Sequence, residues 1–159
     1  MLMANSPLHV FEHPWFWCGF LGWIVAQLIK LVTDLVTNHK VDFSYLVSTG
    51  GMPSAHSSMA CGLATGIGLT EGFDTPLFVL ALAFAAVIMF DAAGVRNAAG
   101  QQARLLNQIA DELFTDGHFN APKMKELLGH TRLEVFAGMG TGIVVAVLVV
   151  WLGWPNLLA

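Results

Sequence analysis

The chain has 159 residues, of which 55% are hydrophobic and 11% are charged, and its formal net charge is −4. An average soluble domain is about 25% charged, and a soluble core of this size cannot cover so much apolar surface. Disordered chains are polar and highly charged, and the small, evenly spread charge gives no sign of a nucleic-acid partner. Most of the chain is therefore predicted to lie in lipid.

Four segments approach the roughly 20 apolar residues that a transmembrane helix needs, namely 15–36, 53–70, 76–95 and 133–151. The second and third are rich in Gly and Ala, which let helices approach closely in lipid. Packing is the expected role of Gly62, Gly66 and Gly68. The sequence predicts an all-α fold: an integral-membrane helical bundle of about four transmembrane helices, in one domain over residues 1–159.

The ends of the chain carry interfacial residues but no signal peptide. Tryptophan favours the membrane–water interface, and it flanks the first and last segments as Trp15, Trp17, Trp23, Trp151 and Trp154. Residues 1–14 contain no Lys or Arg, and no small-residue cleavage site follows, so no secretory signal is predicted. Cys18 and Cys61 lie in apolar runs and are expected to behave as small hydrophobes.

The distribution of basic residues predicts the orientation. Six basic residues lie after the first segment or between the third and fourth: Lys40, Arg96, Arg104, Lys123, Lys125 and Arg132. The N-terminal tail, the 71–75 turn and the C-terminal tail have none. By the positive-inside rule, both termini face outward and the basic connections face the cytoplasm, even when Arg96 is left out. A bacterial inner membrane is the expected location.

The connection between the third and fourth segments is predicted to contain an amphipathic helix over approximately 98–114. Apolar residues recur there at helical spacing, as Ala99, Ala103, Leu106, Ile109, Ala110, Leu113 and Phe114. Polar residues lie on the opposite face, as Gln101, Arg104, Gln108 and Asp111. Such a helix either lies at the cytoplasmic interface or covers the bundle.

Ionisable groups within a transmembrane segment are costly and are therefore candidates for function. Gln27, Lys30 and Asp34 follow one another at spacings of three and four, so they share one helix face. Two interpretations of Lys30 remain open. It is either a buried cation facing the bundle interior, or a snorkelling partner of Asp34 near the helix end.

A second polar cluster, from Ser48 to Ser58, surrounds the start of the second segment. Its glycines and Pro53 suit a loop that leads into a helix. The free N–H groups of a helix N-terminus can bind an anion such as phosphate. His56 lies within the first turn, close enough to exchange a proton with a bound group.

Two further clusters border the long connection. Arg96 either binds phosphate through two hydrogen bonds or is only a positive-inside anchor. Glu134 follows His130 by four residues, so its carboxylate can accept from one ring nitrogen and leave the other as a nucleophile or base. Lys30, His56, Arg96, His130 and Glu134 come from four helices yet map to one membrane face. Phosphoryl transfer through a phosphohistidine requires such groups.

Three runs of residues resemble one family. They are Gly-Gly-Met-Pro-Ser-Ala-His at 50–56, Phe-Asp-Ala-Ala-Gly-Val-Arg at 90–96, and Lys-Glu-Leu-Leu-Gly-His-Thr-x-x-Glu-Val-Phe-Ala-Gly at 125–138. Together they are similar to the divergent, small-membrane-protein branch of the type 2 phosphatidic acid phosphatase and vanadium haloperoxidase superfamily. The similarity runs from about residue 27 to about residue 145.

The resemblance implies a role for each matching residue. His130 would be the nucleophile that takes the phosphoryl group, Glu134 would orient it, and His56 would be the general acid that protonates the leaving group. Phosphate would be bound by the remaining matches, which are Lys30, Ser54, Ala55 and Arg96. No metal or other cofactor is implied, and vanadate would act only as a phosphate-mimicking inhibitor.

The chain also departs from the superfamily signature. Ala55 stands in place of Gly, and Glu134 stands in place of Asp. The Arg-Pro pair that would follow Lys30 is absent, and the amphipathic helix separates Arg96 from His130. Some members of the superfamily have six helices, so a homodimer that completes the bundle is an open alternative to a monomer.

Three functions are consistent with these features. The first is an integral-membrane phosphatase that hydrolyses a lipid phosphate or pyrophosphate at the cytoplasmic interface. The departures favour the second, a non-catalytic protein that binds or transports a lipid phosphate and retains the anion site. The third is a purely structural membrane subunit, which predicts that His56 and His130 lie far apart.

Overall fold

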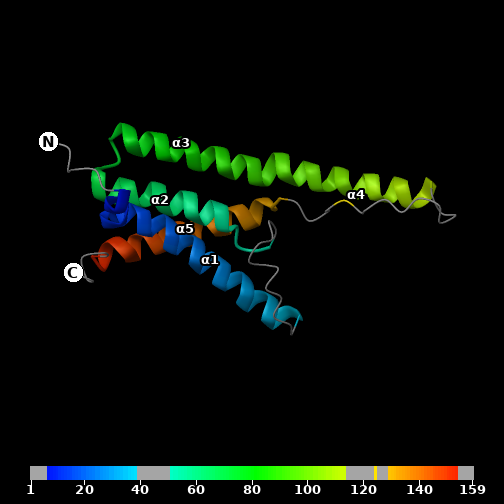
Figure 1. Ribbon diagram of the computed structural model, residues 1–159, viewed down its shortest axis with the longest axis horizontal. Helices are drawn as coiled ribbons and strands as arrows, with labels where there is room; N and C mark the ends of the chain where they lie inside the picture. Colours follow the sequence, from blue (N-terminus) through cyan, green and yellow to red (C-terminus); the bar gives the residue numbers. More distant parts are fainter. Residues whose placement is uncertain (1–6, 39–50, 114–123, 125–128, 154–159) are drawn as a thin grey trace.

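The computed structural model describes residues 7–38, 51–113, 124 and 129–153, and all regular structure within them is helical. The elements in chain order are the 3-10 helix η1 (Pro7–Glu12), α1 (Pro14–Asn38), α2 (Ala55–Glu71), α3 (Pro76–Phe90), the π-helix η3 (Asp91–Val95), α4 (Arg96–Leu113) and α5 (Arg132–Trp151). Figure 1 shows them as an elongated bundle. The predicted all-α fold class is confirmed.

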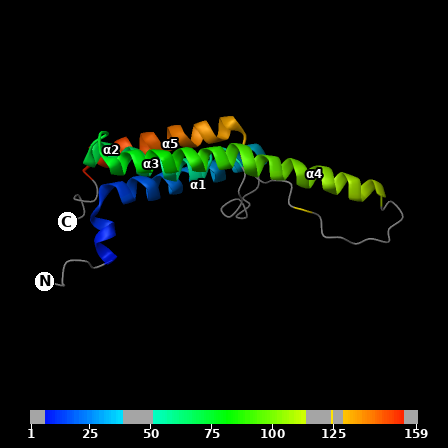
Figure 2. The same cartoon turned by 90° about the horizontal axis from the view of Figure 1, so that it is seen from above.

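The central helix of the bundle is α2. It packs against α1, α3 and α5, and α1 also packs against α5. α1 and α3 run in one direction along the bundle, and α2 and α5 run in the opposite direction (Figures 1 and 2). One end of the bundle therefore combines the C-terminal half of α1, the start of α2, η3 and the start of α5. We call it the site end, because the candidate residues lie there.

The helices approach α2 closely because small residues line the crossings. A Cβ added at Gly142 of α5 would collide with the carbonyl oxygen of Ser58 in α2. One added at Gly62 of α2 would lie 2.7 Å from the carbonyl oxygen of Cys18 in α1, and one at Gly66 would lie 2.8 Å from the Cys18 side chain. Small residues at helix crossings are typical of membrane bundles. The packing role expected for Gly62 and Gly66 agrees with these contacts.

Three helical stretches are long and apolar enough to cross a membrane: Pro14–Val36, Pro76–Glu112 and Arg132–Trp151. At the position of the second predicted span lies α2, which has 17 residues and is shorter than these three. Its Ser57 and Ser58 are fully buried against neighbouring helices. The chain is thus an integral-membrane helical bundle, and its central helix, α2, is less apolar than the three helices that pack around it.

A single helical rod is formed by α3, η3 and α4, and it extends well beyond the rest of the bundle (Figures 1 and 2). Its 37 apolar-to-amphipathic residues, Pro76–Glu112, measure about 55 Å at 1.5 Å per residue. The hydrocarbon core of a bilayer is only about 30 Å thick, a distance that α3 and η3 can already cross. α4 therefore projects from the site end along the axis of α3 and does not cover the bundle.

The predicted amphipathic segment forms α4, and Ala103 of its apolar face is buried, whereas Leu106 and Ile109 are exposed. Exposed apolar residues on one face are typical of a helix at a membrane interface. Asn107, four residues after Ala103, is also buried, and its side chain pairs with the backbone of Met124 through hydrogen bonds of 2.9 and 3.0 Å. Asn107 was not singled out from the sequence.

Candidate functional site

Backbone and cap contacts join the start of α2 to the start of α5. Ser54 is the N-cap of α2, and its hydroxyl oxygen accepts from the Ser57 N–H at 3.4 Å and from the Ser57 hydroxyl at 3.1 Å. The N–H of Ser54 donates to the carbonyl oxygen of Glu134 at 3.0 Å. Ser54 is fully buried, and these contacts give it a structural role. A direct contact between Ser54 and phosphate stays a prediction.

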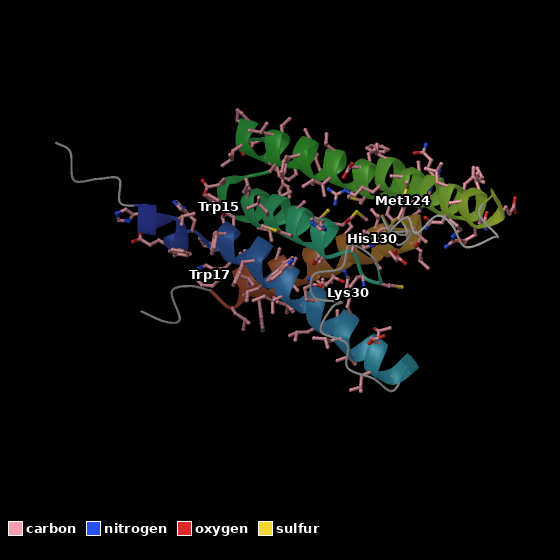
Figure 3. All side chains as sticks on the ribbon, turned by 45° about the vertical axis from the view of Figure 1, so that its right-hand side comes forward. Trp15, Trp17, Lys30, Met124 and His130 are labelled. Carbon is pink, nitrogen blue, oxygen red and sulfur yellow. The ribbon has the colours of Figure 1, made fainter. Side chains whose placement is uncertain are left out.

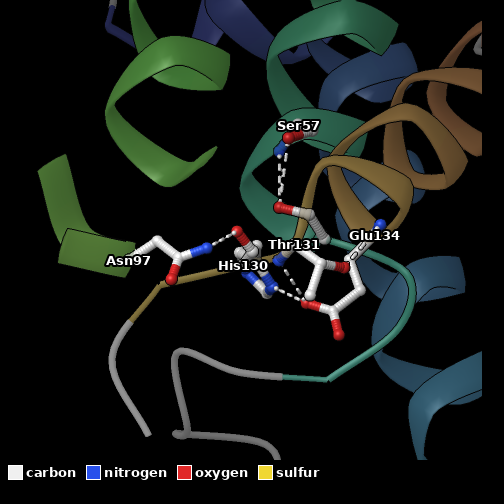
Figure 4. Close-up of polar contacts among 6 residues, drawn as sticks. Ser57, Asn97, His130, Thr131 and Glu134 are labelled. Atoms are coloured by element: carbon white, nitrogen blue, oxygen red, sulfur yellow. Dashed lines mark hydrogen bonds and ion pairs between the residues drawn. The ribbon is translucent and has the colours of Figure 1, made fainter. Parts of the chain in front are cut away.

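The start of α5 is closed by a capping box. The N–H of Glu134 donates to Oγ1 of Thr131 at 3.3 Å, and the N–H of Thr131 donates to Oε2 of Glu134 at 3.1 Å. Oε2 lies 3.0 Å from Nδ1 of His130 as well (Figure 4). The spacing of four residues predicts this second contact. Since an ionised carboxylate can only accept hydrogen bonds, Nδ1 carries the ring proton.

The other ring nitrogen of His130 has a free lone pair in a buried position. His130 is 3% exposed, and Nε2 has no hydrogen-bond partner among the described residues. Burial lowers the pKa of His130 below its ordinary value, and the charges of Lys30 and Arg96 lower it further. The hydrogen bond that Nδ1 donates to Glu134 and the charge of Glu134 oppose this shift. The imidazole is therefore neutral near pH 7. A buried neutral imidazole of this kind can act as a nucleophile or a base.

The backbone of His130 contacts a different element from its side chain. Its N–H donates to the carbonyl oxygen of Ala92 in η3 at 3.0 Å. Its carbonyl oxygen accepts from Nδ2 of Asn97, in the first turn of α4, at 3.1 Å. Sequence reasoning missed both residues, since neither hydropathy nor motif spacing relates positions 92 and 97 to position 130.

Lys30 is a buried cation at the site end. Its side chain is 5% exposed, whereas a snorkelling lysine exposes its ammonium group. The Lys30 stem passes the loop before α2, where a Cβ added at Gly51 would lie 3.9 Å from Cδ of the lysine. Lys30 interacts electrostatically with Glu134, His56 and His130. Figure 3 places Lys30 and His130 at the same end of the bundle.

His56 lies in the first turn of α2, on its exposed side. It interacts electrostatically with Lys30, Arg96 and His130, so these groups share one region. This proximity disfavours the structural-subunit hypothesis, which expects the two histidines to lie far apart. Ala55, which precedes His56, is buried. The N–H groups of Ser57 and Ser58 donate to Ser54, and those of Ala55 and His56 have no acceptor within the helix.

Arg96 is engaged by an acidic neighbour. Its Nε donates to Oδ2 of Asp91 at 2.6 Å, and the two side chains are 47% and 39% exposed. Exposed ion pairs contribute only about 0–1 kcal/mol, so an anion of higher charge can displace Asp91. Arg96 is thus placed at the border of the site, with its guanidinium accessible.

The site end collects two imidazoles, two cations and a carboxylate, together with the first-turn amides of α2. Within the described part of the chain, no group of three or more His, Cys, Asp or Glu side chains is arranged to hold a metal ion. The groups that are present suit an anion with several oxygen atoms, and phosphate is such an anion.

Comparison with known proteins finds a family and a curated relative that are similar to this chain. A family described as "Divergent PAP2 family" matches residues 11–145. The uncharacterized membrane protein YuiD of Bacillus subtilis (strain 168) is 40% identical over 139 residues, which cover 80% of this chain and 88% of that protein. A comparison with solved structures finds no match.

Proposed function

The chain belongs to the Divergent PAP2 family, and from that premise we propose that it is a membrane phosphatase acting on a lipid phosphate or pyrophosphate. The description of the family supports a phosphatase-like superfamily, and the 40% identical relative is named as a membrane protein. The proposal assigns the bond-forming step to His130 and the site to the cytoplasmic side of a bacterial inner membrane.

One observation carries the proposal. His130 is buried, its Nδ1 is bound to Glu134 at 3.0 Å, and its Nε2 is unpartnered among the described residues. A buried polar atom without a partner is costly to maintain. At this position, such an atom is best explained by a ligand or reacting atom that contacts it during function.

In the first step, the Nε2 lone pair of His130 attacks phosphorus. The bond from phosphorus to the leaving oxygen breaks, and that oxygen keeps the electron pair and takes a proton from His56, which starts the cycle as the imidazolium and becomes neutral. Glu134 stabilises the imidazole through Nδ1 as charge develops on the ring. Lys30 and Arg96 neutralise the phosphate oxygens in the transition state, and the first-turn amide of Ala55 donates to them.

In the second step, water attacks the phosphohistidine. The bond between Nε2 and phosphorus breaks, the electron pair returns to Nε2, and His56 accepts a proton from the water. Phosphate is released, and both histidines regain their starting states. None of these steps requires a group beyond the side chains and backbone amides named, and vanadate is expected to inhibit by resembling the phosphate in the transition state.

A lipid substrate follows from the position of the site. The groups lie at one end of the bundle, at the starts of α2 and α5 and in the C-terminal half of α1. A phosphate headgroup at that end could reach them while its chain stays in the bilayer. The basic connections favour the inner leaflet. Substrates that share the phosphate group and differ in the lipid chain form the test panel.

The test measures phosphate release by the purified full-length protein in lipid nanodiscs. The substrates are phosphatidate and isoprenoid phosphates and pyrophosphates, and each assay is repeated with vanadate. Turnover should be sensitive to vanadate and should be abolished by His130→Ala. His9→Ala is the matched control, because His9 lies in η1, before α1, where its side chain is exposed and pairs with Glu12. Its turnover should match that of the wild type.

Replacement of His56 tests the assignment of the general acid. His56→Ala should slow phosphoenzyme formation most for substrates with poor leaving groups, typically by about 10²- to 10⁴-fold. Equal turnover by the wild type and His130→Ala would contradict the proposal. Saturable lipid-phosphate binding without turnover would instead support the alternative, a protein that binds or transports lipid phosphates.

A further inference from the structure

The junction between η3 and α4 holds the peptide groups on both sides of His130. The N–H of His130 donates to Ala92 at 3.0 Å, and its carbonyl oxygen accepts from Asn97 at 3.1 Å. Both partners lie on the α3–α4 rod, not on α5. The contact of Asn97 with the His130 backbone is drawn in Figure 4. Two hydrogen bonds from one rigid element fix both the position and the direction of this short segment.

The π-helix supplies one of these two partners. The N–H of Arg96 donates to the carbonyl oxygen of Asp91, five residues earlier. In an α-helix that N–H would instead bind the carbonyl of Ala92, four residues earlier. The single π-helical turn therefore releases the Ala92 carbonyl from its helical partner, and His130 takes its place. Single π-turns inside α-helices are rare and frequently lie at functional sites.

The second partner is itself held in place. Nε2 of Gln101, one turn further along α4, donates to Oδ1 of Asn97 at 3.1 Å. With its oxygen occupied, the carboxamide of Asn97 presents Nδ2 toward the His130 carbonyl. The amide orientation that makes the His130 contact is thus the one that Gln101 stabilises.

Gly129 brings the two segments into direct contact. It has a φ of +86°, and a Cβ added there would lie 2.6 Å from the carbonyl carbon of Arg96 and would collide with the backbone nitrogen of Asn97. Only glycine fits both the conformation and the space. The residue before His130 therefore lies against the junction backbone with no room for an intervening side chain.

We propose that Asn97 is a positioning residue for His130, and that the η3–α4 junction sets the location of this imidazole within the site. Glu134 orients the ring through Nδ1 and also accepts from the Thr131 N–H, so it holds the peptide after His130 from the α5 side. Asn97 and the Ala92 carbonyl hold the same segment from the α3–α4 rod. This inference rests on the proposed function of His130 as nucleophile, because it is the reacting position of Nε2 that the junction would control. A misplacement of about 1 Å can lower turnover about 10²-fold.

The test compares four variants of the full-length protein in nanodiscs. Asn97→Ala removes the carboxamide, and Asn97→Asp keeps its shape but removes the Nδ2 donor. Gln101→Ala leaves Asn97 in place but removes its support. Gln102→Ala is the matched control, since Gln102 is an exposed glutamine on the same helix with no contact to this cluster.

Positioning predicts a loss in kcat with little change in KM. For both Asn97 variants kcat should fall about 10- to 100-fold, while KM stays within about twofold, as expected when only the reacting geometry changes. The kcat of Gln101→Ala should fall less than that of either Asn97 variant, and the kcat of Gln102→Ala should match that of the wild type. The inference is overturned if both Asn97 variants keep wild-type kcat, or if their losses merely follow the fraction of unfolded protein. Where Asn97→Ala does not fold, Asn97→Asp and Gln101→Ala decide the matter.

A second readout separates this inference from the proposed function. The rate at which diethyl pyrocarbonate modifies His130, followed by peptide mass spectrometry, reports on the Nε2 environment without any substrate. A change of at least threefold in Asn97→Asp, with none in Gln102→Ala, supports positioning even if the wild type shows no turnover. Unchanged modification of His130 in Asn97→Asp overturns the inference, whether or not the protein is a phosphatase.

Discussion

Oε2 of Glu134 accepts hydrogen bonds from two groups, and the two contacts have different structural roles. The Thr131 N–H uses it to complete the capping box of α5, and Nδ1 of His130 uses it to fix the ring. The first contact contributes to the stability of a helix terminus, whereas the second determines which ring nitrogen carries a proton. Single substitutions can separate the two effects, because glutamine also serves at the third position of a capping box.

We expect Glu134→Gln to retain the fold and lose turnover. The glutamine amide preserves the cap but removes the negative charge that stabilises the imidazole, so kcat should fall about 10²- to 10⁴-fold. Thr131→Ala is the converse control: it should lower stability by about 1 kcal/mol and leave the His130–Glu134 contact in place. Turnover assays and thermal unfolding of both variants measure the difference. Equal kcat for Glu134→Gln and the wild type would exclude an orienting role for Glu134.

The pH dependence follows from the lowered pKa of His130. Its neutral form is the reactive one, so turnover should persist below the ordinary histidine value of 6.5 and be lost only as the pH falls through the lower folded-state pKa. In Glu134→Gln the contact that raises the pKa is weakened, and the acidic limb of kcat/KM should move to still lower pH. A limb above 6.5 in the wild type would contradict a buried, neutral His130.

The sequence predicted the side chains of the site better than the backbone contacts that hold them in place. The His130–Glu134 contact was predicted from a separation of four residues, although His130 precedes the N-cap of α5 and is not itself helical. The burial of Lys30 agrees with one of its two interpretations. Asn97 could not be found in this way, because its contact with His130 joins residues 33 positions apart in the chain. Such contacts depend on how elements pack, which motif spacing does not encode.

At the scale of the elements, the close approach of α2 and α5 depends on the absence of a Cβ atom at two glycines. Gly138 and Gly142 of α5 face the carbonyl oxygens of Ser54 and Ser58, and a Cβ at either glycine would collide with them. Because the obstructing atoms belong to the helix backbone, the clash cannot be relieved by a change of rotamer. Only separation of the helices would relieve it.

Gly142→Ala is therefore expected to destabilise the bundle by about 1–3 kcal/mol, the usual effect of overpacking. Gly140→Ala is its matched control on the same helix, since a Cβ there meets nothing within 4 Å. It should leave stability unchanged or raise it by up to about 1 kcal/mol through helix propensity. Unfolding of both variants in detergent measures the difference, and similar curves for the two would mean that the crossing is looser than described.

Hydropathy located the elements well for a simple physical reason. The residues that cross lipid must be apolar for about 20 positions, and α1, α2, α5 and the α3–η3 pair lie where four spans were predicted, within two residues at each end. The same signal is insensitive to hydrogen-bond register. The π-turn at Asp91–Val95 and the unbroken passage from α3 into α4 therefore had no hydropathic signature.

At the scale of the whole molecule, the direction of insertion decides which leaflet supplies the substrate. The α2–α3 turn lies at the opposite end from α4, so the two regions label opposite sides of the membrane (Figure 2). The native cysteines, Cys18 and Cys61, are 0% and 7% exposed and should give little background. Single introduced cysteines can therefore report the orientation.

We expect a membrane-impermeant maleimide to label Asp74→Cys in intact cells, and to label Gln102→Cys only after permeabilisation. Both positions are exposed, in the α2–α3 turn and on α4 respectively. The expectation follows from the basic residues on the α4 side. The reverse pattern would place the site on the outer face and would point to a substrate in the outer leaflet.

The composition of α2 also bears on how the protein is made. A segment of 17 residues with buried serines and a histidine in its first turn is a weak substrate for the translocon by itself, since polar side chains raise the free energy of insertion. The neighbouring α3 is strongly apolar and follows after a turn of four residues, 72–75. The two helices are therefore expected to enter the bilayer together as a hairpin. The polar groups of α2 can then form contacts within the protein while they are transferred from water into the membrane.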